Sequence, residues 1–131
     1  MSERATASFD ITTWDEQPYD EGDGIRLSRT RVVKVFRGEI EGESAAELLM
    51  AIAGEDSAAY VGVERFSGRV NGREGSFVYL HPATAVRGSQ SASWPVLAGS
   101  GTGELAGISG QLRIDNLPEG GHVVTLDYQL G

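Results

Sequence analysis

The twelve-residue segment 99–110 contains five glycines, and it constrains the fold more than any other stretch of the chain. A loop that binds phosphate needs a lysine at its end and a helix behind it, so that backbone amides and the helix dipole face the anion. No lysine follows here, and residues 111–115 alternate between apolar and polar as strands do. The segment therefore predicts two strands joined by tight glycine turns, and it excludes a nucleotide-binding loop.

Short strands separated by turns account for most of the remaining sequence. Glycine makes up 18 of the 131 residues, about twice its usual share, which favours many tight turns over disorder. The segments between the glycine clusters alternate apolar and polar residues, the period of strands with one buried face. Expected strands cover residues 5–12, 27–36, 59–66, 75–81, 92–97, 111–114 and 123–130. We therefore expect an all-β fold, a small closed antiparallel barrel of about eight strands.

Residues 43–53 favour two structures at once. They are rich in strong helix formers, and Ser44 with Glu47 matches a helix capping box. The tight turn before this segment and the strands on either side of it favour a strand, because tertiary context often overrides propensity. We expect a strand over 44–52, with a helix as the alternative.

Two segments are expected to connect strands. Residues 13–24 are rich in acidic side chains and contain Trp14, Pro18 and Tyr19, so we expect a loop there. Asn71-Gly72 is a dipeptide typical of tight hairpin turns, and it is expected to join strands 59–66 and 75–81.

Composition bounds the class of protein. The 131 residues are expected to form a single domain, 1–131, large enough for a hydrophobic core without cross-links. Cysteine is absent, which removes disulfides, thiolate metal ligands and thiol nucleophiles. No stretch approaches the ~20 apolar residues of a membrane span, and the first residues do not resemble a secretion signal. A soluble cytoplasmic protein without a membrane partner is the simplest expectation.

The charge balance argues against nucleic-acid binding. Eleven basic and nineteen acidic residues give a net charge of −8, which repels nucleic acid and anionic membranes. Positive charge is concentrated locally at Arg26, Arg29, Arg31, Lys34 and Arg37. These residues fall on both faces of the expected strand 27–36 and its start, so they do not form one basic stripe, and no nucleic-acid partner is expected.

Several motifs, in order over nearly the whole chain, resemble those of a bacterial family of unknown function with the allene-oxide-cyclase-like β-barrel. The motifs are residues 14–19 (WDEQPY), 62–68 (GVERFSG), 75–81 (GSFVYLH), the glycine segment 99–110, and 125–128 (TLDY). Leu80 departs from the pattern, because a polar residue is expected before the histidine. Leucine at this position is expected to make the adjoining surface more apolar.

A looser likeness extends to plant allene oxide cyclases and dirigent proteins. It rests mainly on Gly101-Thr102-Gly103 with Gly107 and Gly110 downstream. These relatives hold an apolar substrate inside the barrel and guide its cyclisation or coupling without a cofactor. The resemblance therefore implies an apolar small-molecule partner, no cofactor and a homo-oligomer.

An acid–base pair is the first candidate site. Alternation places two sets of mostly aromatic side chains on single faces of neighbouring strands. The sets are Tyr60, Gly62, Glu64 and Phe66 in one strand, and Phe77, Tyr79 and His81 in the next. If these faces look inward, Glu64 and His81 form a catalytic pair in an aromatic chamber and can move protons near neutral pH. The alternatives are a purely structural pair, a Glu64 bonded to Arg26 or Arg29, or a Glu64 that faces solvent.

Glu47 is the third candidate acid. In a strand it would share a face with Ala45, Leu49 and Ala51, as a single carboxylate in apolar surroundings that could steady a developing cation or act as a base. The alternative is a glutamate that faces solvent.

Aromatic side chains are the candidate ligand-binding residues, and Trp14 is also a candidate lid because it lies in the expected acidic loop. The candidates are Trp14, Tyr60, Phe66, Phe77, Tyr79, Trp94 and Tyr128. The alternative is that they fill the core. No metal site is expected, because the two histidines, His81 and His122, lack ligand spacing.

Two functions fit these residues. The first is a cofactor-free cyclase or isomerase that folds an apolar small molecule in a shaped chamber, with Glu64, Glu47 or His81 supplying one acid–base or electrostatic contact. The second is a non-catalytic barrel that binds a small molecule or serves as a scaffold, assembled through a flat strand face or monomeric.

Overall fold

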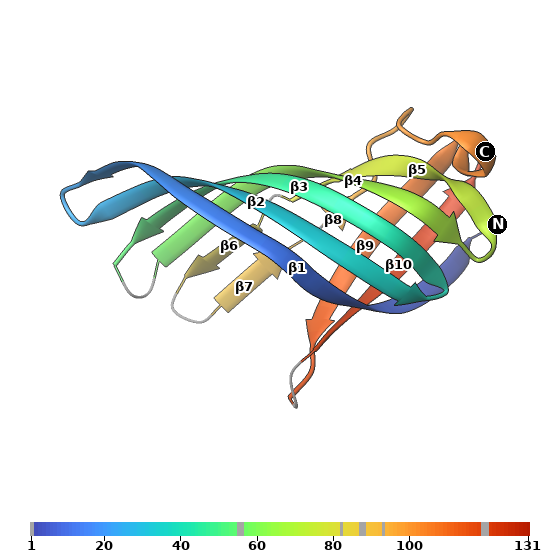
Figure 1. Cartoon of the computed structure of the whole chain (residues 1–131), viewed down its shortest axis with the longest axis horizontal. Helices are drawn as coiled ribbons and strands as arrows, with labels where there is room; N and C mark the ends of the chain where they lie inside the picture. The colour runs from blue at the N-terminus through green and yellow to red at the C-terminus, as the bar shows by residue number, and fades with distance from the viewer. Residues whose placement is uncertain (1, 55–56, 82, 87–88, 93, 119–120) are drawn as a thin grey trace.

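Ten antiparallel strands and one short 3-10 turn make up the computed structural model, which describes residues 2–54, 57–81, 83–86, 89–92, 94–118 and 121–131 (Figure 1). The strands are β1 (Glu3–Gly22), β2 (Ile25–Gly38), β3 (Ile40–Ala53), β4 (Ser57–Val70), β5 (Arg73–Leu80), β6 (Ala83–Val86), β7 (Ser89–Ala92), β8 (Trp94–Pro95), β9 (Ile108–Asn116) and β10 (His122–Leu130). The 3-10 turn, η1, covers Gly103–Leu105. None of the described helical residues forms a segment long and apolar enough to cross a membrane.

Eight of the strands form a nearly closed barrel, which confirms the expected fold. The hydrogen-bonded order runs β4-β3-β2-β1-β10-β9-β8, and β5 pairs with the other edge of β4. A bridge between Tyr79 and Val96 joins β5 to the segment after β8 and completes the ring. The β6–β7 hairpin pairs with the first residues of β4 and extends the sheet beyond the ring.

The glycine-rich segment closes the barrel, and its structure differs from the expected pair of strands with tight turns. β8 and β9 do pair, but residues 97–105 between them lie along β5 and form a seam. The Oγ of Ser100 accepts a hydrogen bond from the amide of Val78 (2.9 Å), and the Oγ1 of Thr102 accepts one from the amide of Ser76 (3.0 Å). Leu105, in η1, is fully buried. Side chains in the seam therefore replace part of the missing strand ladder.

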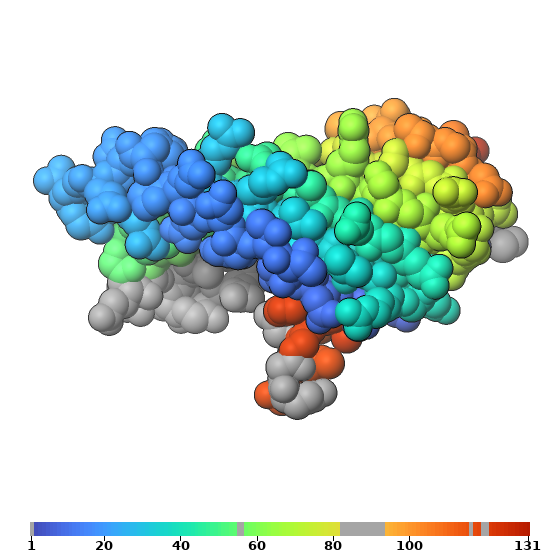
Figure 2. Space-filling view, in the orientation of Figure 1, coloured from blue at the N-terminus to red at the C-terminus, as the bar shows by residue number. Residues whose placement is uncertain are grey.

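The expected loop at 13–24 is wrong, because most of it belongs to a long strand. β1 continues to Gly22, paired with β2 as far as the Gly22–Ile25 register. The pairing has two register shifts, at Ile11/Thr13 and at Pro18/Asp20, and the second adjoins Pro18, which has no amide hydrogen to donate. β10 pairs with β1 only as far as Phe9, so the hairpin beyond that point extends past the barrel (Figures 1 and 2).

The other segment expectations have mixed outcomes. Residues 44–52 are a strand, held by β2 on one side and β4 on the other. The hairpin turn is confirmed, since Asn71 and Gly72 both have positive φ (49° and 82°). The expected strand 92–97 is instead the end of β7 and the short β8, on either side of residue 93, which lies outside the described residues.

Buried side chains inside the barrel form two apolar layers with a polar layer between them. Phe9, Phe36, Phe66 and Phe77 belong to the larger cluster, which fills the closed end. The second cluster consists of Val32, Ala46 and Leu48, with Met50 and Tyr60 packed against it. Four buried polar side chains occupy the inward-facing positions between these clusters. They are Lys34, Ser44, Glu64 and His81.

Candidate functional site

Neighbouring strands bring the polar layer together. Lys34 lies opposite Ser44 in the β2–β3 register, and Glu64 lies opposite Tyr79 in the β4–β5 register. Because side chains alternate between the two faces of a strand, these inward-facing positions meet at one level of the barrel. His81 follows β5 directly, where its backbone exchanges two hydrogen bonds with Gly62.

Glu64 is the centre of the site and is 0% exposed. Its Oε1 accepts hydrogen bonds from Lys34 Nζ (3.1 Å) and from His81 Nε2 (2.6 Å), and its Oε2 accepts one from Ser44 Oγ. Burial alone raises the pKa of a carboxyl group, but the hydrogen bond from His81, the charge of Lys34 and the bond from Ser44 lower the pKa of Glu64 to about 2. Glu64 is therefore a buried anion with three donors.

The geometry excludes two of the alternatives for Glu64. Its strand face looks inward as expected, so it does not face solvent, and it is bonded to His81. The alternative with Arg26 or Arg29 as partner is excluded, because the cation that contacts Glu64 is Lys34. Sequence reasoning missed Lys34 and Ser44, although both occupy inward positions of their strands. The position of Lys34 between buried Val32 and Phe36 was the available sign.

Aromatic rings surround the buried charges. The ring of His81 packs on Trp94 (centroids 4.2 Å apart) and on Tyr79 (5.3 Å). Lys34 Nζ lies 5.0 Å from the ring centroid of Phe9 and 5.2 Å from that of Trp94, within cation–π range. This packing keeps water away from the ion pairs and strengthens them.

Two buried donors lie beside these charges. The Trp94 Nε1 lacks a hydrogen-bond partner among the described residues, and the Tyr79 hydroxyl, which lies beside Glu64 and Ser44, makes no hydrogen bond of regular geometry there. Burial and the negative charge of Glu64 raise the pKa of Tyr79 well above its usual value, so its hydroxyl keeps its proton. Buried polar groups are nearly always bonded, so these two donors are exceptions among the buried groups of the described residues.

The remaining aromatic candidates divide between two places. Phe66, Phe77 and Tyr128 belong to the packed cluster at the closed end, where Asn71 Nδ2 donates a hydrogen bond to the Tyr128 hydroxyl (2.7 Å). Tyr60 and Trp14 lie on the other side of the polar layer. Tyr60 packs against the smaller cluster. Trp14 lies opposite buried Val32, on the inner face, and is half exposed.

Glu47 lies on the outer wall of the barrel, where it is paired with two arginines and is not the single carboxylate in apolar surroundings that was expected. Its carboxylate accepts hydrogen bonds from Arg29 Nε and Arg31 Nη1, both at 3.0 Å. The hydrogen bond from Arg29 is the main cause that lowers the pKa of Glu47. Alternation alone could not reveal this, because it groups residues on a face without showing which face looks inward.

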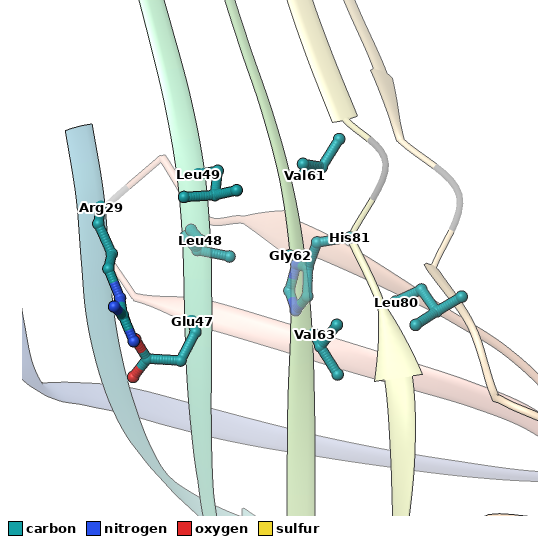
Figure 3. A pocket seen from close by; sticks show the side chains of 9 residues that line it. All are labelled: Arg29, Glu47, Leu48, Leu49, Val61, Gly62, Val63, Leu80 and His81. Atoms are coloured by element: carbon teal, nitrogen blue, oxygen red, sulfur yellow. The ribbon is translucent and has the colours of Figure 1, made fainter. Parts of the chain in front are cut away.

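A groove of about 590 Å³ lies on the same outer wall (Figure 3). The side chains of Leu49, Val61, Val63 and Leu80 line it, and Arg29 with Glu47 stands at one end; Leu48, Gly62 and His81 complete the lining. Leu80, the departure from the family pattern, contributes to this apolar surface. We call this feature the outer groove. Elsewhere in the described ranges, histidine and acidic residues form no group of three suited to a metal ion.

Comparison with known proteins identifies relatives without an assigned activity. A search of curated proteins gives no match. The crystal structure of a protein of unknown function from Shewanella oneidensis MR-1, of the DUF3224 family, is similar over 100% of this chain and 99% of that one, with 30% sequence identity and a TM-score of 0.87. The sequence profile described as "Protein of unknown function (DUF3224)" matches residues 5–128. The chain therefore belongs to the DUF3224 family.

Proposed function

We propose that the protein binds a small, largely apolar molecule beside the polar layer and acts on it as a cofactor-independent isomerase or cyclase. One observation carries the proposal: a fully buried Glu64 carboxylate is bonded to His81, with the buried donors of Tyr79 and Trp94 next to the pair. Perturbed carboxyl groups paired with an imidazole in a shielded setting are common at sites of proton transfer.

His81 is the acid–base group in this mechanism. Glu64, being ionised, accepts a hydrogen bond from the Nε2–H group, which leaves Nδ1 as the nitrogen that can take a proton. Nδ1 removes a proton from a carbon of the bound molecule and returns it to another atom of the same molecule. The net change is an isomerisation, and no oxidant or reductant is needed. Glu64 fixes the tautomer and favours the transient imidazolium, so it is a positioning residue.

Tyr79 and Trp94 supply the second requirement of such a reaction. Removal of a proton next to a carbonyl group places negative charge on the carbonyl oxygen. Fixed donors in a dry site stabilise that charge more than water does. The Tyr79 hydroxyl and Trp94 Nε1 are donors of this kind, so an apolar ketone or aldehyde is the substrate class that fits them.

The inner face beyond the polar layer supports a route by which a small molecule reaches His81. There the β1–β10 pairing has ended, and Ser28 Oγ is buried without a bonding partner among the described residues. Met50, Tyr60 and the half-exposed Trp14 provide apolar surface on the same side. Trp14 retains its role as a proposed lid over this region.

Exchange of hydrogen with solvent tests the proposal directly. The protein is incubated in deuterium oxide with cyclohexanone, acetophenone and a long-chain methyl ketone, and the mass of each ketone is followed. Wild-type protein is expected to accelerate deuterium uptake into at least one of them, and His81→Asn to lose roughly 10²–10⁴-fold of that rate. Glu64→Gln should slow it as well, while Glu43→Gln, the same change at an exposed carboxylate of β3, should not.

The second candidate, a non-catalytic binding or scaffold barrel, is favoured by the packed closed end. Phe66, Phe77 and Tyr128 fill that part of the interior, as the core-filling alternative requires. A ketone that raises the melting temperature of wild type and of His81→Asn equally, without deuterium uptake, would support binding alone. At 100 times its Kd a ligand stabilises the fold by about 2.7 kcal/mol, which a thermal shift detects.

A further inference from the structure

The outer groove is an exposed apolar surface with an ordered layout. Leu49, Val61 and Val63 are 52%, 56% and 52% exposed. Leu49 lies directly opposite Val61 in the β3–β4 register, and Val63 lies directly opposite Leu80 in the β4–β5 register, so the four side chains are contiguous. Contiguous apolar patches with a polar rim mark interaction sites on soluble proteins.

The rim of the groove carries surplus positive charge. Arg29 and Arg31 share the single carboxylate of Glu47. Arg65, an exposed residue two positions after Val63 on β4, makes no ion pair with any described residue. In a chain with net charge −8, this is an unusual local excess of arginine, and it selects an acidic occupant.

The end of the β1–β2 hairpin has the opposite character. Residues 14–25, which we call the hairpin tip, contain five acidic residues and no basic one. Only Glu16 among these acids forms an ion pair with a described residue, Arg26. Tyr19 is 62% exposed and Ile25 45% exposed. The tip therefore combines apolar side chains and unpaired carboxylates, the complement of the groove.

Backbone pairing between two tips is disfavoured. Residues 10–22 of β1 have β2 on one side and no strand on the other among the described residues, which is a free sheet edge. However, Pro18 and the two register shifts interrupt that edge, and the acidic side chains of two copies would repel each other. The tip is therefore suited to contact through its side chains.

We propose that the outer groove is a homodimer interface and that the hairpin tip of a second copy occupies it. Tyr19 of the tip packs on the valine and leucine side chains, and the carboxylates of the tip face Arg29, Arg31 and Arg65. Tyrosine and arginine are enriched in the energetically important parts of interfaces. Each copy carries one groove and one tip, so a two-fold axis that places each tip in the other copy's groove gives two equal contacts and closes the assembly at two copies.

Negative and positive substitutions in the groove should have opposite effects if its occupant is acidic, and similar effects if the contact is only apolar. Molar mass is measured by light scattering after gel filtration, over a concentration series. Wild type is expected to be a dimer. Val63→Glu should weaken the dimer by about tenfold or more because it faces the acidic tip, while Val63→Arg should keep it. Leu117→Glu, an exposed leucine outside groove and tip, is the matched control and should have no effect.

The absence of cysteine allows the contact to be mapped by disulfide trapping. Tyr19→Cys and Val61→Cys variants are mixed and oxidised, and a mixed disulfide between the two variants is expected to predominate. A predominant Val61→Cys homodisulfide would mean that groove packs on groove and would overturn the assigned occupant. A wild type that is monomeric throughout the series would overturn the interface itself. Both results are independent of the chemistry proposed for the inner site.

Discussion

Lys34 and Glu64 carry opposite charges in a place that strongly disfavours each charge alone. Lys34 is 6% exposed and Glu64 is 0% exposed. Removing an ion from water costs several kcal/mol, which its partners recover only when geometry and additional hydrogen bonds are good. Ser44 and His81 supply those bonds. Each member of the layer is therefore needed chiefly because the others are present.

Replacing Glu64 by glutamine should lower the free energy of unfolding by roughly 3–5 kcal/mol, because Lys34 is left buried without its counter-charge. Urea denaturation measures the change. Glu43→Gln, at an exposed position, should stay within about 0.5 kcal/mol of wild type. A loss below about 1 kcal/mol in Glu64→Gln would show that Lys34 reaches water or another anion.

The free energy of unfolding should also depend on pH through the ionisation of Glu64. Its pKa is about 2 in the fold and 4.5 as the reference value, so the unfolded chain takes up the proton first as the pH falls. Ionised Glu64 contributes about 3 kcal/mol in total to the free energy of unfolding. This contribution is complete above pH 4.5 and is lost as the pH falls towards 2. Urea titrations across this range should show the decline in wild type. An equally steep decline in Glu64→Gln would assign it to other carboxylates.

The sequence predicted two members of the polar layer, Glu64 and His81, but not the other two, Lys34 and Ser44. Glu64 and His81 stood out because their strands alternate aromatic and polar side chains, and both are buried and bonded to each other. Lys34 was grouped with the arginines around it, because a single strand does not show which of its two faces is buried. The same ambiguity placed Glu47 in apolar surroundings, although it contacts two arginines outside the barrel.

Among the strands, β1 has two environments along its length. Its first part, to Phe9, lies between β2 and β10, while residues 10–22 pair with β2 alone among the described strands. Composition predicted a loop for the second part, since acidic residues and Pro18 are rare within sheets. The structure permits a strand there because an edge position needs no amide from Pro18 and two register shifts absorb the mismatch.

Hydrogen exchange should separate the two parts of β1. Amides in residues 10–22 that face away from β2 have no strand partner in the described part of the chain and should exchange at rates close to those of unstructured chain. Amides of β3, which is paired on both sides, should be protected up to the stability of the whole fold. Mass spectrometry of peptides covering β1 and β3 makes the comparison. Uniform protection along β1 would show that its outer edge is covered in solution.

The β3–β4 pair depends on a close approach of two backbones. A Cβ at Gly68 would collide with the carbonyl oxygen of Glu41, so Gly68→Ala should cost more than about 2 kcal/mol. Gly72→Ala is the matched control: φ is +82° there, but no atom lies within 4 Å of the added carbon, so only about 1 kcal/mol is expected. Thermal unfolding ranks the two variants, and equal losses would mean that the strands can separate at Gly68.

In the complete fold, the glycine-rich segment determines how the barrel closes. The other seven junctions of the ring are strand ladders, whereas β5 meets residues 96–105 through one bridge, the backbone hydrogen bonds from Leu97 to Val78 and from Thr102 to Ser76, and the side chains of Ser100 and Thr102. The sequence predicted the barrel from its strand spacing, and it predicted glycine turns here. It could not show the seam, because the contacts join residues about 20 apart that belong to no common repeat or motif.

The double change Ser100→Ala and Thr102→Val should therefore loosen the seam. It removes the acceptors of the Val78 and Ser76 amides, and each loss should cost about 1–2 kcal/mol. Exchange of these two amides should accelerate more than that of amides in β3. Ser8→Ala, which removes a weak surface bond (3.5 Å), is the control and should change little. Unchanged exchange at Val78 would place the closure elsewhere.

The pairing of β1 with β10 has a consequence for the order in which the chain can fold. Glu3 lies opposite Tyr128, so this ladder joins residues separated by almost the full sequence, whereas the β2–β3, β3–β4 and β4–β5 hairpins are local. Closing so long a loop is entropically costly, and contacts of this kind slow folding. On the ribosome the first strand must wait, with residues 3–9 of its edge uncovered, until the last strand has emerged.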